Sequence, residues 1–291
     1  MLTDIEDKLS DRLKRLNYFL FLIRKNPLMI VGLVIIFGLI LVTVFAVQIA
    51  TYDPIKINPP ERLKPPNLKY LFGTDDLGRD IFSRIVYGTR ITLRMGMTVI
   101  TAALVIGSFF GVLAGFFGGI VDEIIMRITD VFMSYPYLVL AMVLTVALGP
   151  SIQNAILAMA IVWWPTYARL MRSEVLRIKE NYYVKASQGF GASDSFIILG
   201  HILPNSWVPV LVQCTLDFGR VIMYGASLSF IGLGPQPPAP EWGAMINAGR
   251  FFIENAWWYS TFPGLAIMVT ILGFNLLGDG LRDIFDPRLR R

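Results

Sequence analysis

The chain has 291 residues, of which 55% are hydrophobic and only 16% are charged. Soluble domains carry nearer a quarter charged residues, so the composition excludes an ordinary soluble protein and indicates a membrane protein. A single cysteine and a single histidine exclude an internal disulfide and a cysteine- or histidine-based metal cluster. Basic residues that flank membrane spans explain the net charge of +5 without a nucleic-acid partner.

The N-terminal residues 1–27 are predicted to form a cytoplasmic amphipathic segment. Within 1–25, apolar residues recur at helical spacing with charged residues between them, which is typical of a helix lying on a membrane surface. A solvated basic tail is the alternative. The uncharged segment 28–50 is longer than the apolar core of a signal peptide, so it is predicted to be a retained first transmembrane helix.

Uncharged or nearly uncharged windows predict six transmembrane helices, since a span needs about 20 mostly apolar residues, and Asp217 and Arg220 interrupt the fifth window. After the first, the spans are expected within or near 95–121, 131–148, 152–170, 206–233 and 255–278. The Gly-Pro-Ser sequence 149–151 separates the third span from the fourth. The predicted fold class is therefore an all-α membrane protein, a polytopic helical bundle.

Lys and Arg residues are unevenly distributed among the connecting segments. They are more numerous in 1–27, 118–129, 169–201 and 282–291 than in 51–94, 149–151 and 234–258. Positive residues favour the cytoplasmic side, so both termini are predicted to be cytoplasmic. The predicted division is a cytoplasmic segment 1–27, a first transmembrane helix 28–50, an extracytoplasmic loop 51–90, a core of five transmembrane helices 91–281 with a cytoplasmic loop 173–204, and a cytoplasmic tail 282–291.

Small residues occur at regular spacing in the second predicted span. Gly107, Gly111 and Gly115 recur at every fourth position, which places them on one face of a helix. Such a face allows the backbone of another helix to approach closely. We interpret this pattern as a helix-packing surface.

The long loop after the first span contains a group of charged residues, Asp75, Asp76, Arg79 and Asp80. The structural interpretation is that Asp75 or Asp76 caps a helix that begins near Leu77, while Arg79 and Asp80 are solvated. A metal site is disfavoured because no further ligands follow in the sequence. A functional role in contact or gating at the outer surface is the alternative.

The segment 182–205 lies between two predicted spans. Its first part, up to Gly191, has the residue pattern of a short helix. Tyr183, Ala186 and Phe190 fall on one helix face. Gly191 follows, at a position where a helix end with positive φ is least costly. A short cytoplasmic helix that stops at this glycine is therefore predicted.

A second short helix is predicted directly after that glycine. Either Ser193 or Asp194 is suited to cap its first turn with a side-chain oxygen. The residues that follow are strongly apolar as far as Pro204, which is expected to end the helix, and Asn205 is a suitable cap for the fifth span. The loop is thus predicted to be a bent pair of short helices, packed toward the membrane on one side.

Two further groups of polar residues stand out. Asp217 and Arg220 are three residues apart within the fifth span, so they share a helix face, either lining a translocation path or forming an ion pair that only fixes packing. The sequence PQPPAPEWG (235–243) is predicted to be an extended outer turn, because prolines prevent a regular helix. Its Glu241 and Trp242 are candidates for a gate at the outer mouth, and an anchor at the membrane interface is the equal alternative for Trp242.

The 182–204 loop resembles the coupling loop of ABC importer permeases, which reads E-A-A, then Gly, then I-x-L-P. The matching residues are Lys185-Ala186-Ser187, Gly191 and His201-Ile202-Leu203-Pro204. Lys replaces Glu, Ser replaces the second Ala, and His stands where Ile is expected. The resemblance assigns coupling to Tyr183, Lys185, Ala186, Ser187, Gly191, Ala192, Asp194, Leu203 and Pro204.

Three longer stretches are similar to the C-type subunit of dipeptide, oligopeptide and nickel importer permeases. They are FGTDDLGRDIFSRIVYGTRITL (72–93), GASLSFIGLGPQPPAPEWGAMI (225–246) and FPGLAIMVTILGFNLLGDGLRDIFDPR (262–288). The resemblance implies the ABC type I importer permease fold in a cell membrane. It also implies three kinds of partner, namely a second homologous permease in a heterodimer, two cytoplasmic ATPase subunits and an extracytoplasmic substrate-binding protein. In the functional interpretation of the outer loop, Asp75, Asp76, Arg79 and Asp80 contact this binding protein or form a gate.

The chain itself has no sequence motif for catalysis. It lacks the G-x-x-x-x-G-K-[ST] pattern that holds nucleotide phosphates, so no cofactor is expected on this chain, and ATP and Mg²⁺ would be used by the partner ATPases. The expected function is a transport subunit for peptides, with nickel chelates or oligosaccharides as alternatives. An ion-coupled secondary transporter is the alternative of another class, disfavoured because no internal repeat is evident.

Overall fold

The computed structural model describes residues 21–285, and within this range the chain is helical without a β-strand. The predicted segment 1–27 lies largely outside the described residues, and so does most of the tail 282–291. The helices are α2 (Pro27–Val44), α3 (Ala46–Ile49), α4 (Ile81–Phe117), α5 (Gly119–Met133), α6 (Tyr137–Leu148), α7 (Ile152–Lys179), α8 (Tyr182–Gly189), α9 (Asp194–Ile197), α10 (Leu203–Phe230), α11 (Trp242–Gly249) and α12 (Trp258–Phe285).

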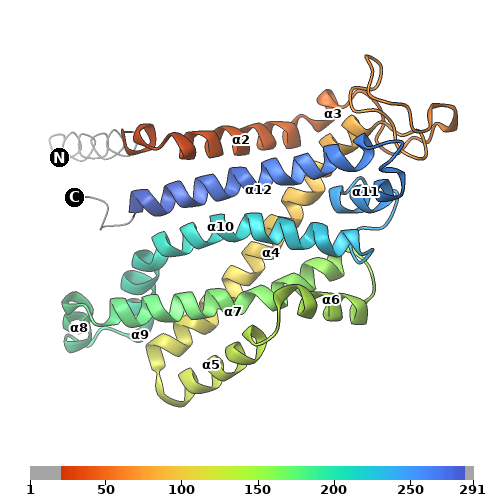
Figure 1. The fold of residues 1–291 in the computed structure, drawn as a ribbon. Coiled ribbons are helices and arrows are strands. Elements are labelled where there is room, and N and C mark those ends of the chain that lie inside the picture. The colour runs from red at the N-terminus through yellow and green to blue at the C-terminus, as the bar shows by residue number, and fades with distance from the viewer. Residues whose placement is uncertain (1–20, 286–291) are drawn as a thin grey trace.

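The long helices form an elongated bundle with two distinct ends (Figure 1). Helices α2, α12, α10 and α7 run alongside one another, and α4 crosses them obliquely. At one end, which we call the α11 end, lie α3, the 51–80 loop and α11; at the other, the α8 end, lie α8 and α9. The start of α2 and the end of α12 also meet at the α8 end, where Asn26 Nδ2 donates to Asp283 Oδ2 at 3.3 Å.

Four helical segments in the described range are long and apolar enough to cross a membrane. They are α2, α4, α12 and the continuous stretch Asp194–Phe230, and a fifth is obtained if α5 and α6 count together as one broken span. Helix α7 is 28 residues long but does not meet the same test. Six spans and the sidedness of the bundle therefore stay predictions.

The predicted third span, 131–148, is wrong as a single helix. Helix α5 ends at Met133, α6 begins at Tyr137, and the two are bent by 89°. Pro136 explains the break, since a proline disfavours helical backbone at the residue before it. An uncharged window shows which residues can lie in the hydrocarbon core of a membrane, but it does not show where the backbone turns.

Two predicted loop boundaries are also corrected. Helix α4 begins at Ile81, so the predicted loop 51–90 is too long, and α7 extends to Lys179, inside the predicted loop 173–204. Asp80 sets the first boundary because its Oδ2 accepts from the backbone N–H of Ser83 at 2.8 Å. Both helices carry charged residues in these extensions, which a search for uncharged windows leaves out.

The glycine-lined face of α4 packs against α7, as predicted from its spacing. A Cβ atom at Gly107 would lie 2.4 Å from the carbonyl oxygen of Trp164, and one at Gly111 would lie 2.4 Å from that of Ala168. At Gly115 a Cβ would lie 2.8 Å from that of Val175. The neighbouring atoms at the first two positions belong to the backbone, so they cannot move aside.

Replacing Gly111 with Val is expected to separate α4 from α7 and to lower the free energy of unfolding by about 1–3 kcal/mol, as overpacking does. Thermal unfolding in detergent would measure the change, with the reactivity of the only cysteine thiol, Cys214, as the signal. Gly38→Val is the matched control, because a Cβ at Gly38 meets nothing within 4 Å. Equal unfolding midpoints for the two variants would contradict the packing role.

Candidate functional site

The 182–204 loop contains the two predicted short helices and the predicted glycine between them. Gly191 has φ of +79°, the left-handed conformation that glycine adopts without strain, which confirms its predicted role. Of the two proposed caps, Ser193 is the one used: its hydroxyl accepts from the N–H of Phe196 at 3.4 Å. Asp194 is instead the first residue of α9.

The prediction that Pro204 stops the second helix is wrong. Helix α9 passes through a π-helical turn, Ile198–Ile202, directly into α10, and Pro204 lies in the first turn of α10. The N–H of Leu203 donates to the carbonyl of Ile198, five residues earlier, so the missing N–H of Pro204 falls where the helical hydrogen-bond pattern changes from π to α. Asn205 is not a cap either, since its side chain donates to the carbonyl of His201 at 2.6 Å.

The loop has one face buried and one face exposed. Val184, Ile197 and Ile202 are almost fully buried against α4 and α7. On the other face, the side chains of Tyr182 and Phe190 are 91% and 92% exposed. The loop is therefore fixed to the bundle by aliphatic residues and exposes aromatic side chains on its other face.

The residue that reverses the expected charge, Lys185, has a partner inside the loop. Its Nζ lies 2.6 Å from Oε2 of Glu180, at the end of α7. The hydrogen bond from Lys185 lowers the pKa of Glu180. Both side chains remain largely exposed, so the pair contributes little to stability. The charge of Lys185 is balanced locally and does not require an acidic partner elsewhere.

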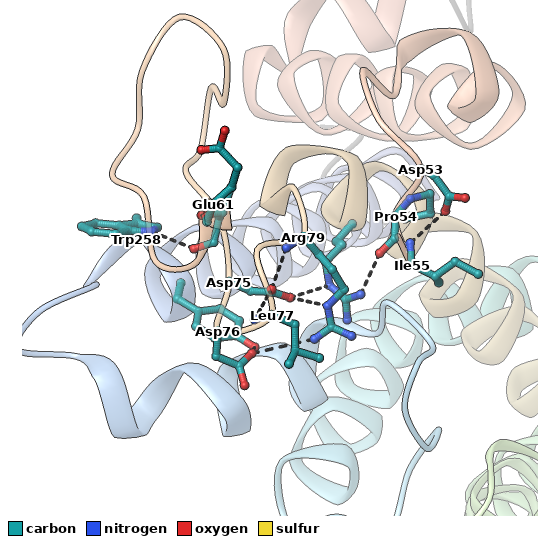
Figure 2. Close-up of polar contacts among 12 residues, drawn as sticks. Asp53, Pro54, Ile55, Glu61, Asp75, Asp76, Leu77, Arg79 and Trp258 are labelled. Carbon is teal, nitrogen blue, oxygen red and sulfur yellow. Dashed lines mark hydrogen bonds and ion pairs between the residues drawn. The ribbon is translucent and has the colours of Figure 1, made fainter. Parts of the chain in front are cut away.

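The charged residues at positions 75–80 form a largely buried network with Arg84 at the α11 end (Figure 2). Asp75 is fully buried, and its Oδ2 accepts from Arg79 Nε at 2.6 Å. Arg84, from the first turn of α4, places its Nε 3.6 Å from the same oxygen and donates from Nη1 to the carbonyl of Pro54 at 2.8 Å. One buried carboxylate thus lies between two buried guanidinium groups.

This arrangement corrects the predicted cap. Asp80, not Asp75 or Asp76, caps α4, and Asp80 and Arg79 are buried rather than solvated. Asp75 instead closes the preceding turn, where its Oδ1 accepts from the N–H groups of Leu77 and Arg79 at 2.9 Å each. Adjacent carboxylates compete for the same capping role, and their order in the sequence does not decide between them.

Asp76 connects this network to α12. Its Oδ1 accepts from the hydroxyl of Tyr259 at 2.9 Å and lies 3.8 Å from Nη2 of Arg79. The neighbouring Trp258 donates from Nε1 to the carbonyl of Thr74 at 3.2 Å. The 51–80 loop is thereby attached to the helical bundle by side chains that are distant in sequence.

Glu241 and Trp242, the predicted gate residues, are both 1% exposed. Glu241 caps α11, since its Oε2 accepts from the N–H of Ala244 at 2.8 Å, and burial raises the pKa of its carboxyl group. Trp242 donates from Nε1 to the carbonyl of Ile85 at 3.1 Å and packs over Gly88. These contacts join α11 to α4. A gating role stays a prediction.

Asp217 and Arg220 do share a face of α10 and form an ion pair, with 3.3 Å between Asp217 Oδ1 and Arg220 Nη1. Gln213, one turn earlier, donates from Nε2 to the other oxygen of Asp217 at 3.0 Å. The carboxylate is 1% exposed, whereas the arginine side chain is 59% exposed. The acid is fixed inside the bundle, and the guanidinium lies on an uncovered face of α10.

Two family models match the chain. The model described as binding-protein-dependent transport system inner membrane component matches residues 107–291, and that described as N-terminal TM domain of oligopeptide transport permease C matches residues 17–66. The chain belongs to this permease family. The resemblance to C-type importer permeases is thus confirmed, and the chain is a membrane permease of the ABC importer type.

Curated relatives cover nearly the whole permease. The dipeptide transport system permease protein DppC of Alkalihalophilus pseudofirmus is 46% identical over 92% of this chain and 88% of its own length. The probable D,D-dipeptide transport system permease protein DdpC of Escherichia coli is 47% identical over 92% of this chain and 90% of its own. An inward-facing structure of the MetNI methionine ABC transporter shares the fold, with a TM-score of 0.58 and 21% identity over 71% of this chain and 98% of that chain.

The permease keeps its candidate residues in three separate places. The candidate coupling residues lie at the α8 end, the Asp217–Arg220 pair lies within α10, and the 75–80 network lies with Glu241 and Trp242 at the α11 end (Figure 1).

Sequence reasoning missed Arg84, Tyr259 and Gln213. Only Gln213 had a local signal, since it lies four residues before Asp217. Among residues 21–285, no three Asp, Glu, His or Cys side chains converge as metal ligands do.

Proposed function

We propose that the permease is one half of the translocation pathway of an ATP-driven, binding-protein-dependent peptide importer. The names of the relatives, which are dipeptide permeases at 46% and 47% identity, support peptides as the substrate. The observation that carries the coupling role is the 182–204 loop, with aliphatic residues buried in the bundle and Tyr182 and Phe190 exposed. Nickel chelates or oligosaccharides are the alternative substrates.

In this proposal the chain is a transport subunit and not an enzyme. Two cytoplasmic ATPase subunits hydrolyse ATP with Mg²⁺, and their closure displaces the 182–204 loop. A second homologous permease completes a heterodimer in the inner membrane, with six spans and both termini cytoplasmic in this chain. A substrate-binding protein delivers the peptide at the α11 end.

The Asp217–Arg220 pair is proposed to line the translocation path. A charged side chain in a span normally faces a bundle interior or an aqueous cavity, because lipid contact is costly. The exposed guanidinium of Arg220, at 59%, supports an aqueous or subunit-facing surface on α10. The 75–80 network supports a rigid outer loop against which a binding protein docks.

Purification of the permease with its native partners from mildly solubilised membranes tests the coupling role. Two ATPases, a second permease and a binding protein are expected to co-purify. Phe190→Ser is expected to reduce the recovered ATPase at least several-fold, because Phe190 is 92% exposed and apolar. Leu68→Ser is the matched control, since Leu68 is fully exposed at the α11 end.

Recovery of the permease alone or as a homodimer, with no ATPase in any detergent, would contradict the proposal. Equal loss of ATPase in both variants would indicate a general surface effect and not a docking site.

A further inference from the structure

The only histidine of the permease, His201, lies in the π-helical turn that joins α9 to α10. Its Nε2 lies 3.1 Å from the hydroxyl of Ser187 on α8. Ser187 and His201 are two of the three positions that depart from the E-A-A and I-x-L-P pattern. The two departures therefore contact each other across the loop.

The imidazole ring also contacts both short helices through aromatic side chains. Its centroid lies 5.7 Å from that of Tyr183 on α8 and 5.5 Å from that of Phe196 on α9, and both pairs are edge-on. Edge-on packing is a favoured geometry for aromatic rings. One side chain thus joins α8 to α9 by a hydrogen bond and two ring contacts.

The backbone of His201 continues these contacts into α10. Its carbonyl accepts from the side chain of Asn205, in the first turn of α10, at 2.6 Å. The flanking Ile197 and Ile202 are almost fully buried, so the turn itself is firmly packed. A π-helical turn is rare and frequently lies at a functional site.

The connection between α8 and α9 is itself closed by backbone hydrogen bonds, from the N–H of Gly191 to the carbonyl of Gln188 at 3.0 Å and from the N–H of Ala192 to that of Ser187 at 3.1 Å. It contains Gly189 and Gly191, and a Cβ atom at either position would meet nothing within 4 Å. Gly191 also has positive φ. The turn between the two short helices therefore has a defined backbone, and Val184 is the only residue of α8 that is fully buried within the described structure.

We propose that the Ser187–His201 contact is a strut that makes α8 move together with α10. The inference rests on the proposed coupling role of the 182–204 loop. Displacement of α8 by an ATPase would pass through His201 to α10, the helix that carries Asp217 and Arg220. His201 is thus a positioning residue, which touches neither nucleotide nor substrate.

The test uses the complete transporter in proteoliposomes, with transport and ATP hydrolysis measured on the same sample. Ser187→Ala removes the hydroxyl, and His201→Phe keeps a ring but removes the hydrogen bond. Each is expected to lower the amount transported per ATP hydrolysed by about tenfold, the upper range for one hydrogen bond. Ser187→Thr, which keeps the hydroxyl, is the matched control and is expected to retain wild-type coupling.

The double variant Ser187→Ala/His201→Phe distinguishes a strut from two independent roles. With a strut, its loss of coupling equals that of either single variant, and ATPase recovery stays at the wild-type level. Additive losses, or unchanged coupling with the ATPase still bound, would overturn the strut and leave the docking role intact. Loss of bound ATPase in Ser187→Ala would also overturn the strut, because the contact would then shape the docking surface. Absence of ATPase from the wild-type complex would instead refute the proposed function.

Discussion

Replacing Asp75 with Ala is expected to lower the free energy of unfolding of the permease by about 3–5 kcal/mol, as the loss of one partner from a buried ion pair does. Arg79 and Arg84 are only 7% and 4% exposed, and Asp75 is the buried carboxylate between them. Without it, two guanidinium groups remain buried with like charge. The thermal unfolding midpoint in detergent, read from the reactivity of Cys214, measures the loss.

The adjacent carboxylate provides the control for this variant. Asp76 is 30% exposed and lies 3.8 Å from Arg79, so Asp76→Ala is expected to cost far less. Asp75→Asn should fall between the two, because an amide oxygen can still accept from the N–H groups of Leu77 and Arg79, whereas the negative charge is lost. If Asp75→Ala and Asp76→Ala unfold at the same temperature, the network does not stabilise the outer loop as the geometry indicates.

Features of the fold that depend on local spacing could be predicted from the sequence. The glycine face of α4, the positive φ of Gly191 and the pairing of Asp217 with Arg220 each follow from the residue type and its helical position. In each case the physical requirement acts within a few residues, or on one face of one helix. A single sequence contains enough information for such features.

Features that depend on contacts between distant segments could not be predicted. No pattern links Asp75 to Arg84, or Asp76 to Tyr259, because the partners meet only after the 51–80 loop has folded against α4 and α12. The bend at Pro136 did have a local signal, but charge-free windows measure hydropathy and not backbone geometry. Their boundaries therefore missed the break between α5 and α6.

The departures of the 182–204 loop from the family pattern illustrate the same limit. Taken singly, Lys185 and His201 weaken the resemblance. In the folded loop, Lys185 pairs with Glu180, and His201 with Ser187. Each departure has a side-chain partner that the family pattern does not include, so the loop still folds as two short helices although its polar contacts differ from those that the pattern would provide.

Replacing Arg220 with Gln is expected to have the second large effect, a loss of about 3 kcal/mol in stability together with most of the transport activity. The change leaves the carboxylate of Asp217, which is 1% exposed, without its charged partner, although the hydrogen bond from Gln213 remains. An uncompensated charge inside a span is costly. Asp217→Asn should cost less, because the side chain of the arginine left behind is 59% exposed and is not buried with its charge uncompensated.

The double variant Asp217→Asn/Arg220→Gln separates a packing role from a role in transport. Removing both charges leaves an amide that can still accept from Gln213, so the unfolding midpoint should return close to that of the wild type. If Arg220 lines the path, peptide transport in proteoliposomes stays low although the fold is restored. If the pair only fixes packing, transport returns with stability. Because both measurements are made on one variant, a transport defect cannot be attributed to a loss of fold.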